Sequence, residues 1–311
     1  MITSLLLALA PIALLFALGT GLRRSHFLAE TFWPQAERLG YYVLLPSLFL
    51  HGLATARMDG VPVWAMVATL VSSTVFVAAT LVGLRRRLAV DDPAFTSVFQ
   101  GGVRFNNYVG VSAAAGILGT QGVALAAVAN ATIVPTVNVL CVLVFARYGS
   151  QGRLSAKKVA RQLATNPLVV ACVAGITLQV SGVSLPPMME PVLRALGLAS
   201  LPLGLLCLGA ALDFSAAKRW LRPVGVSSVA KFGLMPLATL LACHAFGLGG
   251  PAAMAALLFQ TLPTASSSYI MARQLGGDAP LMAGIVAVQT LLAAIAMPLS
   301  VWGLSGFTHA A

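Results

Sequence analysis

Ten stretches of the chain consist mostly of apolar residues and are about 20 residues long or longer. A helix of about 20 residues crosses the hydrocarbon core of a bilayer. The pattern therefore predicts ten transmembrane spans, and the fourth and ninth of them are the least uniformly apolar. We number them 1 to 10 in chain order: 2–21, 36–56, 61–84, 97–118, 121–147, 160–181, 188–212, 223–246, 250–273 and 279–304.

Composition supports this interpretation, because 59% of the residues are hydrophobic and only 9% are charged. A soluble domain carries about 25% charged residues. The chain is therefore predicted to be an all-α integral membrane protein. Its first span has no preceding basic segment, and Arg23 and Arg24 follow the apolar run. We expect this span to be a retained helix and not a cleaved signal peptide.

Basic residues mark alternate loops. Most of the 19 Lys and Arg residues follow odd-numbered spans, whereas the loops after even-numbered spans hold only Arg57 and Arg194. Short loops rich in Lys and Arg stay in the cytoplasm. The odd loops are thus predicted to be cytoplasmic and both termini to lie on the outer side. The net charge of +11 is then a topology signal within lipid, and we expect no nucleic-acid partner.

The two halves of the chain contain corresponding sequence segments. The segment "FQGGVRFNNY" at 99–108 corresponds to "FQTLPTASSSY" at 259–269, and prolines in spans 1 and 2 correspond to prolines in spans 6 and 7. We therefore predict a first five-helix repeat at 1–148, a cytoplasmic loop at 149–159 and a second repeat at 160–311. An odd number of spans gives the two repeats opposite orientations, which is typical of secondary transporters.

The best-matched segments fall on spans 4 and 9, and both contain helix-breaking residues. Pro263 interrupts span 9, and we expect Gly101 and Gly102, with the asparagines after them, to interrupt span 4. A broken helix in hydrocarbon frees backbone polar groups, which is tolerated only where protein or a watery cavity receives them. Paired interruptions at equivalent places indicate a transporter's binding site. Simple packing is the alternative explanation for the serines of span 9.

With these residues in hand, the chain resembles a known family. "FQGGVRFNNYVG", the following helix with Asn130, Pro135 and Asn138, and "LVFARYG" are similar to the bacterial branch of the auxin efflux carrier family. Bacterial members are described as malonate or malate permeases, and the wider superfamily includes bile acid/sodium symporters. Plant members have a proline at both interruptions, whereas this chain has asparagines at the first.

The resemblance implies a crossover fold in which broken helices 4 and 9 cross at the substrate site. Helices 1, 2, 6 and 7 would form a scaffold, and helices 3–5 and 8–10 a transport domain that moves as an elevator. It also implies a bacterial inner-membrane location and a homodimer through the scaffold helices.

Charge indicates what such a site binds. All eight acidic residues fall in loops or at predicted helix ends, whereas Arg104 and Lys231 lie inside spans. An intramembrane cation beside amides and helix N-termini suits an organic anion such as a carboxylate. Asn130 is added because the resemblance implies a substrate-facing residue there. The candidate substrate-binding residues are Arg104, Asn106, Asn107, Asn130, Thr264, Ser266, Ser267, Lys231 and Gln289.

Two of these residues have structural alternatives. Arg104 could instead pair with backbone carbonyls at the crossing, and Lys231 could bond the carbonyls of a broken helix. No metal-ligand spacing, HExxH motif, membrane aspartate pair or phosphate-binding loop is present, so we expect no metal, no cofactor and no enzymatic activity. Each cysteine stands alone in a different span: Cys141, Cys172, Cys207 and Cys243.

The sequence thus favours a secondary transporter for a small mono- or dicarboxylate, working by elevator-type alternating access. One alternative is a sodium- or proton-coupled symporter of a neutral or steroid-like solute. Another, from a different class, is a membrane receptor or scaffold that does not transport.

Overall fold

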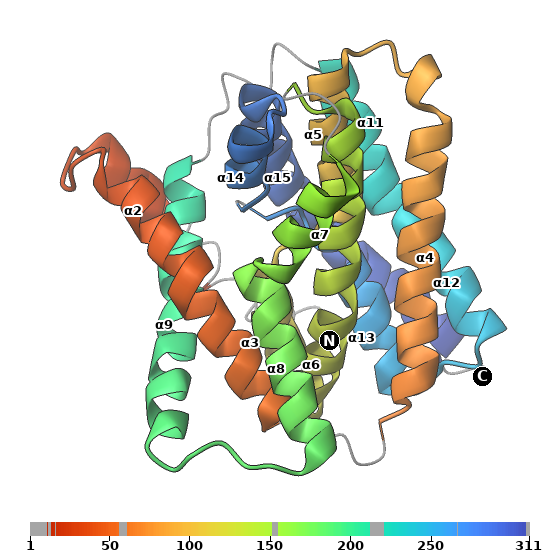
Figure 1. Cartoon of the computed structure of the whole chain (residues 1–311). Coiled ribbons are helices and arrows are strands. Elements are labelled where there is room, and N and C mark those ends of the chain that lie inside the picture. Colours follow the sequence, from red (N-terminus) through yellow and green to blue (C-terminus); the bar gives the residue numbers. More distant parts are fainter. Residues whose placement is uncertain are drawn as a thin grey trace.

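Every regular element in the described part of the chain is a helix (Figure 1). The computed structural model describes residues 11, 14–15, 17–55, 61–150, 155–211, 221–265 and 267–308. Five helical runs there are long and apolar enough to cross a membrane: Val63–Gly83, Val109–Tyr148, Met189–Cys207, Leu221–Ala245 and Ala279–Ser300. The prediction of an all-α, multi-pass membrane protein is confirmed at this level.

The first half of the chain contains one interrupted and one kinked run. Its elements are α2 (Phe32–Leu39), the π-helix η1 (Gly40–Leu44), α3 (Leu45–Ala54), α4 (Val63–Gly83), the 3-10 turn η2 (Arg85–Arg87), α5 (Asp92–Val103) and α6 (Asn107–Tyr148). Gly119, inside α6, has φ 59° and ψ −139°, and the chain kinks there between two helices. Glycine adopts this backbone without a side-chain clash. The kink lies where the sequence predicts the boundary between spans 4 and 5.

In its described part, the second half of the chain consists of shorter helices and two long ones, α9 and α15. Its elements are α7 (Ala156–Ala164), α8 (Pro167–Ser181), α9 (Met189–Ala211), α11 (Leu221–Val229), the π-helix η3 (Ala230–Leu234), α12 (Met235–Ala245), α13 (Gly250–Gln260), α14 (Ser267–Leu275) and α15 (Ala279–Thr308). The helical conformation is thus interrupted between the end of α13 and the start of α14, around Pro263.

Both π-helical turns directly precede a proline near the start of the next helix. η1 leads into Pro46 of α3, and η3 leads into Pro236 of α12. Proline has no N–H to bond the carbonyl four residues earlier, so a widened turn before it relieves the local strain. Lys231 lies in the second of these turns.

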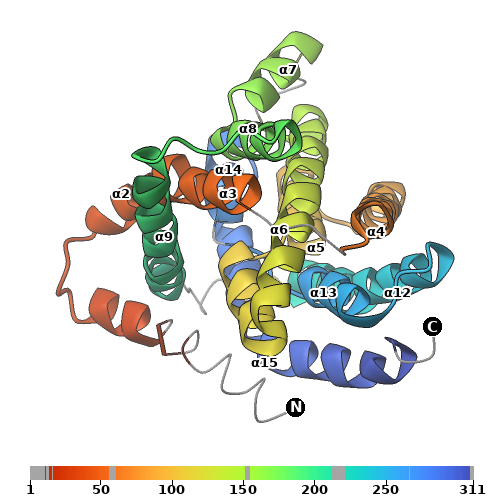
Figure 2. The ribbon, with the colours of Figure 1, turned by 90° about the horizontal axis from the view of Figure 1, so that it is seen from below.

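The helices pack as two groups that α6 joins. α3 packs against α8 and α9, and α2 also contacts α9. On the other side, α4 packs against α12, while α13 contacts α6 and α15. Figures 1 and 2 show α2, α3, α8 and α9 on one side of the molecule and α4, α12 and α13 on the other. α6 contacts members of both groups, so it forms the wall between them.

The glycine pair of span 4 does not interrupt the helix as the sequence suggested. Gly101 and Gly102 are helical residues of α5, and the helix ends later, at Val103. Their missing side chains serve close packing instead. A Cβ on Gly101 would collide with Ser227 and come 2.6 Å from Ile285 Cγ2, and one on Gly102 would come 2.6 Å from Leu81 Cδ1.

This packing predicts that Gly101→Val destabilises the protein. The added side chain would overpack the contact of α5 with α11 and α15, at a cost of about 1–3 kcal/mol. Thermal unfolding of the purified protein in detergent should show a lower Tm. Gly52→Val is the matched control, because a Cβ at Gly52 meets nothing within 4 Å. Equal Tm values for the two variants would contradict the close-packing role.

Candidate functional site

The two interruptions of the helices meet in space. The first lies between α5 and α6, at residues 104–106, and the second between α13 and α14, where residues 261–265 are described. The backbone N–H of Asn106 donates to the carbonyl of Pro263 at 2.7 Å. Beside this bond, the rings of Phe105 and Phe259 lie with their centroids 5.9 Å apart. The two interruptions are therefore joined by a backbone hydrogen bond and by an aromatic contact beside it.

Local chemistry explains why the first interruption ends where it does. Arg104 has extended backbone angles, φ −75° and ψ 160°, which terminate α5. The side chain of Asn106 then accepts from the N–H of Val109 at 3.3 Å, and its carbonyl accepts from Gly110 at 3.0 Å. Asparagine is a preferred N-cap residue for this reason. Asn106 thus caps the start of α6, and a proline at this position could not donate the bond to Pro263 because it has no N–H.

At the second interruption, Pro263 has no N–H, and hydroxyls serve neighbouring backbone groups. Thr261 Oγ1 donates to the carbonyl of Leu257 at 2.8 Å. Thr264 Oγ1 and Ser268 Oγ lie 3.1 Å apart. These bonds use the hydroxyls within the turn, so Thr264 is occupied locally and fully buried.

Gln289 of α15 braces both interruptions at once. Its Oε1 accepts from the N–H of Thr264 at 3.1 Å. Its Nε2 donates to the carbonyl of Gly101 at 3.0 Å and to Ser227 Oγ at 3.1 Å. The side chain is completely buried. Since each end of the amide already has a protein partner, the structure gives Gln289 a bracing position at the crossing.

Arg104 points across the crossing towards the second half of the chain. Its Nη1 lies 3.1 Å from Asn138 Oδ1 and 3.2 Å from Met271 Sδ, and its Nη2 donates to Ser267 Oγ at 3.2 Å. The side chain is only 5% exposed. All three partners are neutral, and no ion pair found among the described residues includes Arg104. Its positive charge is therefore not compensated by a nearby carboxylate.

A cavity lies beside Arg104, between the two groups of helices. Its volume is about 60 Å³, measured as the space open to the centres of water molecules. One water needs about 10–15 Å³ by this measure, so the cavity is large enough for a molecule the size of a few waters. The polar side chains lining it are Glu37, Tyr41, Arg104, Asn107, Asn138 and Ser267, and most of the remaining wall is apolar.

Asn107 is the residue most available to a ligand. Both polar atoms of its side-chain amide, Nδ2 and Oδ1, lack a hydrogen-bond partner in the described part of the protein, although the residue is only 8% exposed. A buried amide without partners costs free energy unless something binds it. Asn107 is also the first residue of α6, and Ser267 is the first residue of α14. The positive ends of two helix dipoles thus lie at the cavity wall.

The predicted candidates separate into distinct positions. Arg104, Asn107 and Ser267 line the cavity. Asn106, Thr264 and Gln289 bond the two interruptions to each other, with Gly101 and Pro263 among their partners. Asn130 is buried one turn before cavity-lining Val134, on the same face of α6. Ser266 lies outside the described residues.

Lys231 is buried in η3 but does not line this cavity. The residue is 0% exposed, and its Nζ has no hydrogen-bond partner among the described residues. The alternative bond from Lys231 to carbonyls of a broken helix is therefore not found among the described residues.

Sequence reasoning missed three polar residues of the cavity. Glu37 is half-buried in α2, Tyr41 OH accepts from Asn166 Nδ2 at 3.2 Å, and Asn138 contacts Arg104. The spacing of Val134, Val137 and Asn138 along α6 carried a signal, because these residues share one helix face. Nothing in the sequence placed α2 opposite that face. Within the described residues, no group of three His, Cys, Asp or Glu side chains could hold a metal ion.

The family profile and the relatives that match this chain are all described as membrane transporters. The sequence profile of the family described as "Membrane transport protein" matches residues 4–301. A protein of Rhizobium meliloti (strain 1021) named "Putative malonate transporter" is 24% identical over 267 residues, covering 81% of this chain and 80% of that protein. Human "Sodium/bile acid cotransporter 4" is 38% identical over 109 residues, which is 33% of this chain. The matched part spans only 24% of the human cotransporter.

The bonds of Gln289 predict that Gln289→Leu destabilises the protein. The substitution would leave the Thr264 N–H and the Gly101 carbonyl buried without partners, at a cost of about 1–3 kcal/mol each. Thermal unfolding in detergent should show a clear fall in Tm. Gln121→Leu, at an exposed position of α6, is the matched control and should unfold near the wild-type temperature. A Gln289→Leu protein as stable as this control would exclude the bracing role.

Proposed function

The chain belongs to the membrane transport protein family, the family of the auxin efflux carriers, and on that premise we propose that it is a secondary transporter for a small organic anion. The family match over residues 4–301 confirms the resemblance that the span 4 motif suggested. We propose a mono- or dicarboxylate as the substrate. The relative named as a malonate transporter supports this class, since malonate is a small carboxylate.

The observation that carries the proposal is a buried cation without an anionic partner at the wall of a cavity. Arg104 makes only neutral contacts, and Asn107 beside it offers an unpartnered amide. A guanidinium and an amide at helix N-termini together form a strong carboxylate site. A bound carboxylate would also offset the cost of holding Arg104 inside the membrane.

Alternating access would follow from the two groups of helices. We propose that α2, α3, α8 and α9 belong to a scaffold, and that α4–α6 and α11–α15 form the transport domain. The cavity lies between these groups, which supports a site that changes sides when one group moves against the other. The crossing is bonded within the proposed transport domain, so an elevator movement would carry it intact.

Orientation follows from the charge of the loops. We propose the inner membrane of a bacterium, with both termini on the outer side, because the basic loops follow the odd-numbered spans. Ala36, Leu168 and Cys207 line the cavity near helix ends that adjoin three of these loops. Their convergence supports a cavity that opens towards the cytoplasm in this conformation.

We also propose that the protein forms a homodimer through the scaffold helices. α8 and α9 expose several large apolar side chains, including Val170, Val173, Val180, Val192 and Leu198. Lipid or a second copy would cover such a surface in the membrane. A molecular mass measured in detergent, with the bound detergent subtracted, separates the monomer from the dimer.

One alternative is a sodium-coupled symporter of a neutral or steroid-like solute. The similarity of a third of the chain to human "Sodium/bile acid cotransporter 4" is the observation that favours it. Uptake that requires sodium but not Arg104 would support that alternative. A receptor or scaffold without transport would show no uptake of any candidate solute.

The proposal predicts that Arg104→Gln and Asn107→Ala weaken carboxylate binding and uptake. Loss of a charged hydrogen bond costs about 1.5–3 kcal/mol, which is roughly a 10- to 150-fold loss of affinity. Uptake of radiolabelled short carboxylates into proteoliposomes, and ligand-induced shifts of Tm, measure the effect. Arg161→Gln is the matched control, because Arg161 is an exposed residue of α7 away from the cavity.

Two results would contradict this function. Carboxylate uptake that is unchanged in Arg104→Gln would remove Arg104 from the site. Folded wild-type protein that neither binds nor transports any mono- or dicarboxylate would overturn the proposal itself.

A further inference from the structure

Glu37 is the one acidic residue among the side chains that line the cavity in the described part of the chain. It lies on α2, on the opposite group of helices from Arg104. Among the described residues, Glu37 and Arg104 are the only charged ones in that lining. The cavity therefore presents a positive wall and a negative wall to one small ligand.

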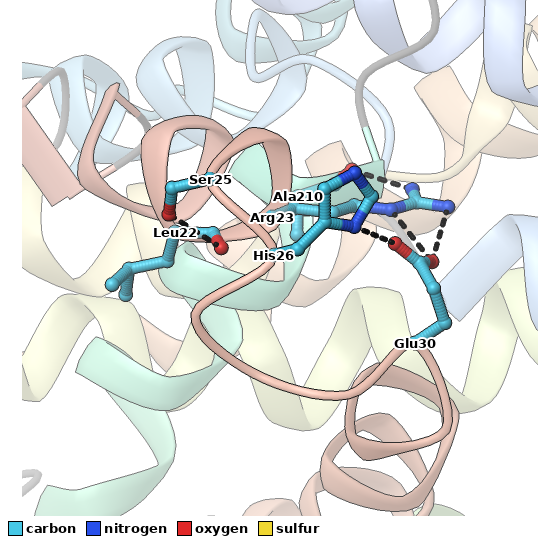
Figure 3. A network of polar contacts seen from close by, with 6 residues as sticks. All are labelled: Leu22, Arg23, Ser25, His26, Glu30 and Ala210. Atoms are coloured by element: carbon cyan, nitrogen blue, oxygen red, sulfur yellow. Dashed lines mark hydrogen bonds and ion pairs between the residues drawn. The ribbon is translucent and has the colours of Figure 1, made fainter.

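The carboxyl group of Glu37 forms no ion pair with another described residue. The described ion pairs do not include Glu37, and it is half-buried on α2. Arg23 and Arg273 are the cations that act on it electrostatically. Arg23, however, bonds Glu30 and the carbonyl of Ala210, as Figure 3 shows.

Arg273 is also held elsewhere. It is exposed, and its guanidinium carbon lies 5.9 Å from the centroid of the Tyr269 ring. Tyr41, in η1 directly after α2, accepts a hydrogen bond from Asn166, and on α9 the lining residue near Glu37 is Cys207. None of these groups forms a hydrogen bond or an ion pair with Glu37, so its carboxyl group remains available to a ligand in the cavity.

The two charges restrict the ligand in opposite ways. A carboxylate favours the wall of Arg104, Asn107 and Ser267. A second carboxylate at the far end of the same ligand would meet Glu37, and two carboxyl groups in a partly desolvated site cannot both be ionised without a cost in free energy. An ammonium group there would be attracted. Between the two walls, Leu45, Phe49 and Phe105 offer an apolar surface to a short carbon chain.

We propose that this site selects a zwitterionic amino-carboxylate over a dicarboxylate, and that Glu37 determines this specificity by receiving the ammonium end. The inference rests on the proposed function, since it assigns the carboxylate end to Arg104. It separates this chain from a carrier of malonate, whose second carboxylate would lie against Glu37.

Three ligands with three carbons test the proposal: β-alanine, propionate and malonate. They share one carboxylate and differ at the other end, which is an ammonium, a methyl group or a second carboxylate. Ligand-induced Tm shifts and competition binding on the purified full-length protein should rank β-alanine first and malonate last. In Glu37→Gln, β-alanine should bind about tenfold more weakly and malonate about tenfold more tightly, whereas propionate should change little.

Matched variants keep the outcomes distinct. Glu190→Gln removes an exposed carboxylate of α9 outside the cavity and should preserve the wild-type ranking. If malonate binds wild type best, or if Glu37→Gln leaves the ranking unchanged while Arg104→Gln abolishes binding, the role of Glu37 is overturned and the carboxylate site stands. If none of the three ligands binds in an Arg104-dependent way, both the carboxylate site and this inference fail.

Discussion

A peptide group that loses its helical partner inside hydrocarbon has no water to bind, so another part of the protein must receive it. This constraint organises the centre of the molecule. The first interruption gives its Asn106 N–H to Pro263, and Gln289 serves the Thr264 N–H of the second and the Gly101 carbonyl near the first. Without the other, each interruption would leave backbone polar groups unpaired, at a higher cost in free energy. Their mutual bonding fixes where α6 and α14 begin, and hence where the cavity lies.

The electrostatics of the cavity depend on that arrangement. Arg104 extends from the first interruption to the start of α14, where neutral atoms of Ser267 and Met271 receive it. Neutral partners orient a guanidinium without cancelling its charge. The cavity wall beside Arg104 thus stays positive, and Glu37, on the other group of helices, is the one acidic residue opposite it in the described part of the chain. A ligand that bridges the groups would experience both charges, so relative movement of the groups would change the field around it.

Much of this architecture follows from sequence because membrane helices are long, apolar and separated by charged loops. The break at Pro263 and the meeting of Arg104 with Ser267 were predictable, since proline and intramembrane charge have few interpretations. The packing role of Gly101 was not predictable, because glycine equally permits a bend or a close helix contact. The position of Ser227 against Gly101 decides for the close contact. Glu37 looked like a loop charge until the fold brought α2 to the cavity. Gln289 looked like a ligand-binding amide until its partners were known.

The bonds of Arg104 also have a consequence for synthesis of the protein. Asn138 follows Arg104 by 34 residues, but Ser267 and Met271 follow by 163 and 167. The arginine must therefore enter the bilayer long before most of its partners have left the ribosome. Contacts so distant in sequence form late and slowly. Until then, the first half of the chain would lie in the membrane with unpaired backbone groups at residues 104–106 and with Arg104 lacking most of its partners. An insertase or a quality-control protease would encounter the chain in this state.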